Sequence, residues 1–125
     1  MTINLLAAWI SFLLGGLAGA ASGLFFRGED WLGGYGSWRR RMTRLGHISF
    51  FGIGLLNLSF ALSARALGLE EGLALPSALL VVGAVTMPLV CYLSAWKEGF
   101  AHAFVVPAGS VIVALGLFVG RLVFR

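Results

Sequence analysis

The chain has 125 residues, of which 59% are hydrophobic and only 11% are charged, and its formal net charge is +4. A soluble domain carries about 25% charged residues, so this composition excludes a soluble globular fold. In a membrane protein, a basic balance indicates topology and contact with anionic lipid, and nucleic acid is not expected as a partner.

Four long apolar runs follow one another, at residues 3–26, 47–67, 77–96 and 101–124. About 20 apolar residues in a helix cross the ~30 Å hydrocarbon layer, whereas the ten-residue alternation of barrel strands is absent. Short connections place consecutive helices side by side and antiparallel. The sequence therefore predicts an all-α polytopic membrane protein, a single domain over 1–125 folded as an antiparallel four-transmembrane-helix bundle.

The first run is retained as a span, because it lacks a preceding basic region and is too long for a signal peptide. It contains Gly15, Gly19 and Gly23 at four-residue spacing, and Gly116 and Gly120 repeat this pattern in the fourth run. Small residues at this spacing let another helix approach closely. We predict that these glycines pack against a helix of the same chain or of another chain.

The segment 27–46 is the longest connection and combines aromatic residues with arginines. Trp31, Tyr35 and Trp38 recur at helical spacing, but the glycines among them disfavour a stable helix. We predict an anchor in the headgroup layer or, alternatively, a short interfacial helix or a surface that recognises a partner. The predicted anchoring residues are Trp31, Tyr35, Trp38, Arg39, Arg40 and Arg41.

Positive charge differs between the two sides of the predicted bundle. Six basic residues fall on the side of the long loop and three on the side of the termini. Because cytoplasmic loops carry an excess of Lys and Arg, we expect this loop to be cytoplasmic and both termini to be outside, in a bacterial inner membrane.

Two histidines, His47 and His102, lie at similar depth near the start of the second and fourth runs. They could ligate a b-type haem, with Arg44 and Arg39–Arg41 pairing with its propionates. They could also hydrogen bond a quinone, or bind copper or zinc together with Cys91 of the third run. The simplest alternative is that both imidazoles lie at the headgroup boundary and bind no cofactor.

Three further polar or helix-breaking residues lie inside the predicted spans. Asn57 is placed in the middle of the second span, where an amide side chain hydrogen bonds to neighbouring helices. Pro88 and Pro107 are expected to break the third and fourth helices, because proline removes a backbone donor.

None of the five acidic residues falls inside a span, which disfavours proton- or sodium-coupled transport. No metalloprotease motif, phosphate-binding glycine loop or triad pattern is present, so we do not expect an enzyme.

The early histidine of the second run and the segment Val105-Val106-Pro107-Ala108-Gly109-Ser110 resemble YgdD-like four-span membrane proteins. That resemblance implies the same span count and no assigned activity. The glycine-rich first run ending in Arg27 is similar to Fluc-type fluoride channels. Those channels have a Thr- and Phe-rich break in the third span, where this chain has Thr86-Met87-Pro88-Leu89 instead.

The sequence favours a small non-enzymatic accessory or structural subunit of a larger membrane complex, surrounded by lipid and packed through its glycine-rich faces. The alternative is a haem- or quinone-binding redox protein that uses His47 and His102, followed by a small channel.

Overall fold

The computed structural model describes residues 1–69 and 71–124 and is helical almost throughout. Four long helices carry the fold, and two short 3-10 helices, η1 (Trp31–Gly33) and η2 (Glu98–Phe104), lie in its connections. The long helices are α1 (Thr2–Phe25), α2 (Trp38–Ala66), α3 (Ala74–Trp96) and α4 (Val105–Val123). Within the described residues, four helical segments have the length and apolar composition of a membrane span, with η2 and α4 together forming the fourth. The predicted all-α four-helix fold of an integral membrane protein is thus confirmed.

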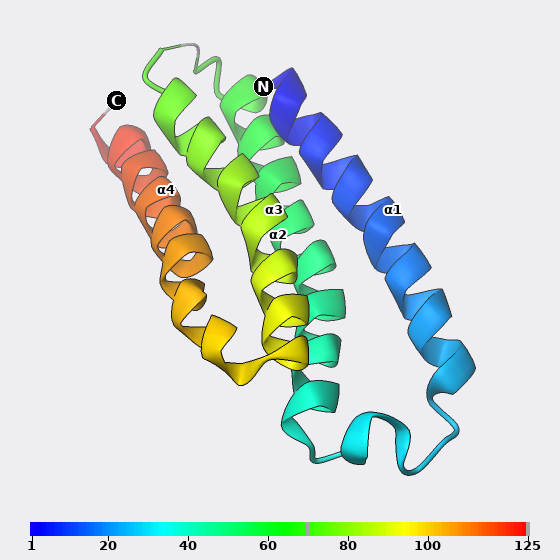
Figure 1. Cartoon of the computed structure of the whole chain (residues 1–125). Coiled ribbons are helices and arrows are strands. Elements are labelled where there is room, and N and C mark those ends of the chain that lie inside the picture. Colours follow the sequence, from blue (N-terminus) through cyan, green and yellow to red (C-terminus); the bar gives the residue numbers. More distant parts are fainter. Residues whose placement is uncertain (70, 125) are drawn as a thin grey trace.

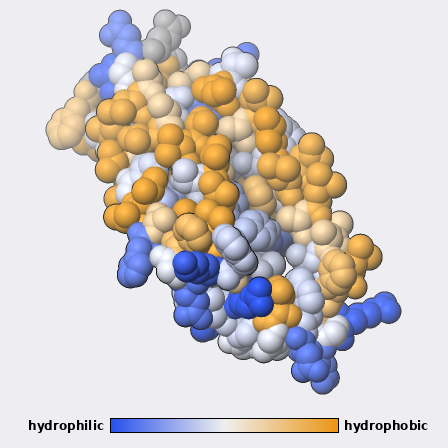
Figure 2. Space-filling view, viewed as in Figure 1, coloured by the Kyte–Doolittle hydropathy of each residue, from blue (hydrophilic) through white to orange (hydrophobic). Residues whose placement is uncertain are grey.

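The helices run antiparallel, with both chain ends at one end of the bundle (Figure 1). α2 and α3 lie in the middle. α1 packs against both of them, and α4 packs chiefly against α3. α1 and α4 therefore form opposite edges of the bundle and are the less buried helices. Figure 2 shows apolar side chains over the helices and hydrophilic residues gathered toward the two ends.

α2 begins well before the predicted residue 47, so the second half of segment 27–46 is helix rather than loop. Ser37 explains this start, because its hydroxyl oxygen accepts a hydrogen bond from the backbone N–H of Arg40. The same hydroxyl donates to the Leu32 carbonyl at 2.6 Å. The arginine-rich first turns lowered the apolar signal there without disfavouring a helix. No α-helix joins Trp31 to Trp38, since η1 is a single turn and the two tryptophans lie in different elements.

The two intramembrane prolines do not break helices as predicted. α3 continues through Pro88 without interruption, and Pro107 lies in the first turn of α4. In a first turn the backbone N–H has no partner inside the helix, so its loss at Pro107 has little cost. The residues directly before α4 form η2, which replaces the predicted α-helical start at residue 101.

Two buried clusters join the helices in the half of the bundle that holds the chain ends. The first is apolar and centres on Phe60 of α2 and Phe118 of α4, whose rings meet edge to face at 4.8 Å. The second is a hydrogen-bonded network of Asn4, Asn57 and Ser77, which ties α1, α2 and α3 together.

Candidate functional site

The polar side chains that could bind a ligand gather where α1 meets α2 and where α3 meets η2. This is the end of the bundle opposite the chain termini. We call this region the basic end. Here the first turn of α2 donates to the last carbonyls of α3: Trp38 Nε1 to Ser94 O at 2.8 Å, and Arg39 Nε to Ala95 O at 3.2 Å. These carbonyls have no partner within their own helix, so the contacts fix α2 against α3 at this depth.

Arg40 is almost completely buried, with 4% of its surface exposed. Its guanidinium donates to three backbone carbonyls at and just after the end of α1, those of Phe26, Gly28 and Glu29, at 3.3–3.4 Å. The C-terminal end of a helix carries partial negative charge, which stabilises a cation placed there. Although we predicted Arg40 as an interface anchor beside the exposed Arg39 and Arg41, it lies inside the protein.

Aromatic rings complete the surroundings of Arg40. Its guanidinium carbon lies 4.9 Å from the ring centroid of Phe26, 5.5 Å from Trp31 and 5.6 Å from Tyr35. The negative faces of aromatic rings attract a cation, and this attraction grows when water is excluded. Trp31 and Tyr35 thus hold the connection between α1 and α2 against a buried positive charge.

Arg44 lies one helical turn further along α2. Its guanidinium carbon is 4.1 Å from the ring centroid of Tyr35, and its Nη1 atom is buried without a hydrogen-bond partner among the described residues. Leaving a buried donor unpaired costs about 1–3 kcal/mol, and more for a charged group. Arg44 also lines a pocket of about 170 Å³ between α1 and α2. This pocket is the strongest candidate binding site at the basic end.

His47 lines the same pocket from the next turn of α2. A Cβ built on Gly19 of α1 would lie 2.6 Å from His47 Nε2, so only glycine leaves room for this imidazole. The other side of the ring meets Phe51 edge to face, with 5.6 Å between centroids. His47 therefore faces α1 inside the bundle.

His102 occupies a different place. It lies on η2, which packs against α3 and α4, and its side chain is exposed. The pocket lined by His47 does not include His102. The two histidines at matched depth thus belong to different helix pairs, and haem or quinone binding stays a prediction that the visible spectrum of the purified protein would test.

Cys91, the third predicted metal ligand, is fully buried between α2 and α3. A Cβ on Gly46 would lie 3.2 Å from Cys91 Cβ and 3.0 Å from the Tyr92 ring. Gly46 faces α3, and the adjacent His47 points toward α1, about 100° further round α2, so Cys91 and His47 lie in different helix contacts. Over residues 1–69 and 71–124, no three His, Cys, Asp or Glu side chains form a group suited to a metal ion.

The predicted packing glycines divide into two groups. Gly15 and Gly19 of α1 face α2, where added Cβ atoms would meet Phe51 and His47 at 2.7 and 2.6 Å. Gly23, Gly116 and Gly120 have open space where a Cβ would be. The first group packs within the chain, and the second leaves hollows on its surface.

Asn57 is fully buried and hydrogen bonds to its neighbours on both sides. Its oxygen accepts from Asn4 Nδ2 at 2.9 Å, and its own Nδ2 donates to the carbonyls of Ile53 and Leu80 at 3.0 and 3.1 Å. Asn4 also donates to the Ser77 carbonyl at 3.2 Å and accepts from the Ser77 hydroxyl at 2.5 Å. Sequence reasoning missed Asn4, although a lone amide in an otherwise apolar first span was a usable signal.

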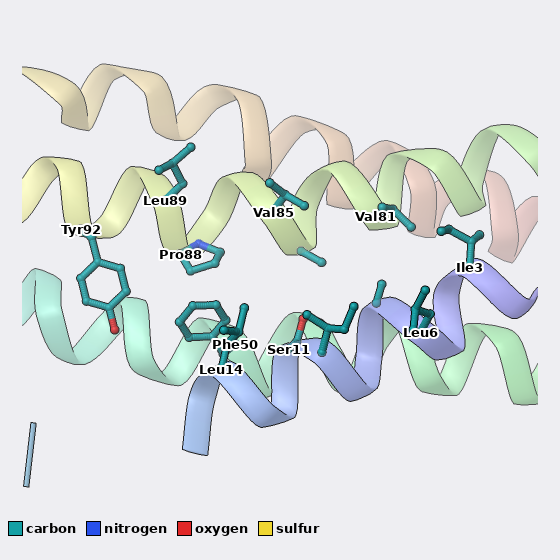
Figure 3. Close-up of a pocket in the computed structure, with 13 residues that line it drawn as sticks. Ile3, Leu6, Ser11, Leu14, Phe50, Val81, Val85, Pro88, Leu89 and Tyr92 are labelled. Carbon is teal, nitrogen blue, oxygen red and sulfur yellow. The ribbon is translucent and has the colours of Figure 1, made fainter. Parts of the chain in front are cut away.

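A second, larger hollow of about 470 Å³ lies between α1 and α3 (Figure 3). Ile3 and Leu6 lie at one end of it, and Phe50 and Tyr92 at the other. Its walls are almost entirely apolar, so it offers few groups that could orient a polar ligand.

No protein-family model matches the chain, and no similar curated protein or solved structure was found. The resemblance to YgdD-like proteins therefore stays a prediction.

Proposed function

We propose that this integral membrane protein is a non-enzymatic accessory or structural subunit, and that α4 is the helix by which it packs against a partner. One observation supports this proposal above others. α4 carries Gly109, Gly116 and Gly120, and a Cβ built on any of them meets no atom of the described residues within 4 Å. Spacings of seven and four residues place these glycines on one face of the helix.

The glycines inside the bundle behave differently. Added Cβ atoms on Gly46 and Gly54 of α2, and on Gly83 of α3, would meet a neighbouring helix at 3.0, 2.8 and 2.5 Å. Each of these three buried glycines is therefore covered by a side chain of a neighbouring helix, whereas no described side chain covers the three glycines of α4. Between lipid-facing helices, shallow glycine faces permit the close approach that gives dispersion contact.

We also propose that the basic end faces the cytoplasm and that both termini lie outside, in a bacterial inner membrane. Support comes from charge, since Arg27, Arg39, Arg40, Arg41, Arg44 and Lys97 all belong to the basic end. The positive-inside rule favours the cytoplasmic side for this excess.

The test is native electrophoresis of membranes extracted in mild detergent, with Gly116→Leu compared with Gly52→Leu. Gly52 is a matched control, because it also faces open space but belongs to no glycine row on α2. We expect the natural chain and Gly52→Leu to migrate in one complex, and Gly116→Leu to migrate as the monomer. A monomeric natural chain, or a complex unaffected by Gly116→Leu, would contradict the proposal.

A further inference from the structure

The small pocket at the basic end has a distinct composition on each wall. α1 contributes Gly19, Ser22 and Gly23, which lie on one face of the helix at three- and four-residue spacing. α2 contributes Thr43 and Arg44 from one turn and His47 from the next. Phe26 and Trp31 close the pocket on the loop side. The α1 wall is therefore formed by small residues with a single hydroxyl group, and the α2 wall carries a permanent cation and an imidazole.

The charge of this pocket is entirely positive. Among residues 1–69 and 71–124, no carboxylate lines it, whereas Arg44 does, and Arg44 Nη1 is buried without an acceptor. A second cation lies just behind the wall, because Arg40 stacks over Phe26 and Trp31, which both line the pocket. Arg44 is half-buried, and the N–H groups of its buried Nη1 atom find no acceptor among the described residues, so the protein itself leaves part of the guanidinium unpaired.

From this arrangement we propose that the pocket binds a phosphate group. A guanidinium presents parallel N–H donors that match two oxygens of a phosphate, and the bonds are strengthened by charge. The Ser22 hydroxyl and the His47 imidazole stand beside Arg44 as further hydrogen-bonding groups. Thr43 shapes the wall, because its hydroxyl already donates to the Arg39 carbonyl at 2.9 Å.

The pocket lies where phosphate groups are available. It lies at the end of the apolar part of α1 and beside the loop of Trp31 and Tyr35, at the depth where aromatic belts meet lipid headgroups. A volume of about 170 Å³ holds a group of several non-hydrogen atoms. The phosphate can belong to a lipid headgroup or be free in solution, and the chemistry of recognition is the same.

The experiment is isothermal titration of the purified full-length protein in a nonionic, phosphate-free detergent. Inorganic phosphate and a short-chain phosphatidylglycerol are the two probes. We expect saturable binding of at least one probe. In Arg44→Gln it should weaken by about tenfold or more, because a hydrogen bond to a charged group is lost. Arg41→Gln is the matched control, since Arg41 is exposed on the same helix and does not line the pocket.

A second pair of variants keeps the charge and changes only the space. Gly23 lines the pocket and Gly16 does not, and both have open space where a Cβ would be. Gly23→Leu should therefore fill the pocket and abolish binding, while Gly16→Leu should bind as the natural chain does. This pair decides the matter if Arg44→Gln does not fold.

The two probes separate the sources of the phosphate. Binding of inorganic phosphate supports a site for the phosphate group itself, and binding of the short-chain lipid alone supports a headgroup site. If neither probe binds, the proposal is overturned. Equal binding by Gly23→Leu and Gly16→Leu, or by folded Arg44→Gln and Arg41→Gln, would overturn it too, because either result would indicate attraction to the basic surface as a whole.

Discussion

The amide side chains of Asn4 and Asn57 form a hydrogen-bonded contact in the interior of the protein. They lie on different helices, are fully buried, and each bonds to the other and to the backbone of α3. In hydrocarbon an amide without such partners is strongly disfavoured. The network therefore specifies which faces of α1, α2 and α3 meet.

We expect Asn57→Leu to lower the free energy of unfolding by about 0.6–2 kcal/mol, the range for hydrogen bonds between membrane helices. The substitution keeps the number of side-chain heavy atoms and the branching at Cγ but leaves one N–H of Asn4 without its acceptor. The measurement is unfolding of the purified protein in mixed micelles of rising SDS content.

A double-mutant cycle supplies the control. Asn4→Leu with Asn57→Leu should cost less than the two single changes added together, because the double variant leaves no orphaned amide between the two positions. Strictly additive costs would show that the two amides do not depend on each other.

At the scale of single residues, the sequence predicted the type of contact better than the partner. Asn57 stood out as a polar group inside an apolar run, but Ser77 and Asn4 come from 20 and 53 residues away along the chain and no spacing rule connects them. Arg40 shows the opposite failure. Its place in a run of arginines gave no sign that it alone turns inward to the carbonyls at the end of α1.

The contact between α1 and α2 is made by glycines of both helices. Gly15 and Gly19 of α1 receive Phe51 and His47, and Gly54 of α2 receives Phe12 and Ser11. This reciprocal arrangement lets two helices approach more closely than larger residues allow. The close approach also creates the walls of the candidate phosphate pocket.

We expect Gly54→Ala to destabilise the fold by about 1–3 kcal/mol, the usual cost of overpacking. The added methyl would lie 2.8 Å from a ring carbon of Phe12 and 3.1 Å from Ser11 Cβ. Thermal unfolding followed by circular dichroism measures the effect.

Gly52→Ala is the control for this change, two residues away on the same helix and in open space. It should leave the unfolding temperature unchanged or raise it, because alanine favours helix more than glycine does. Equal loss in both variants would mean that Gly54 does not report the contact between helices.

The glycine row of α1 was predicted as a single stripe, but its three glycines do not all face the same neighbour in the structure. A step of four residues advances a straight helix by about 40° beyond one turn, so Gly23 is displaced by about 80° from Gly15. This drift explains why Gly15 and Gly19 meet α2 closely and Gly23 only borders a pocket. Gly46, Gly54 and Gly83 form no four-residue repeat that would have predicted their contacts, although each receives a side chain from another helix.

For the whole molecule, apolar run lengths were enough to predict four antiparallel helices. They did not determine the lateral order, in which α2 and α3 are central and α1 and α4 lie at the edges. That order depends on which faces match in shape and hydrogen bonding, and the first and last runs are as apolar as the middle ones. The apolar surface of the edge helices remains available to lipid or to a partner.

The proposed orientation predicts opposite labelling of the two ends of the bundle. In membrane vesicles of known sidedness, a membrane-impermeant maleimide should reach Gly36→Cys only from the cytoplasmic side and Glu71→Cys only from the outer side. The natural Cys91 is fully buried and provides an unlabelled background in the parent chain. The reverse pattern would show that the charge asymmetry does not set the topology.

α1 is attached at its two ends by unlike means. Asn4 holds its beginning through hydrogen bonds to α2 and α3, and Arg40 of α2 binds backbone carbonyls directly after its end. A helix held at both ends can bend, but it cannot slide along its axis or rotate about it. When the surrounding bilayer thickens or thins, α1 should therefore answer by a change of curvature, since sliding in register would break the attachments at both ends.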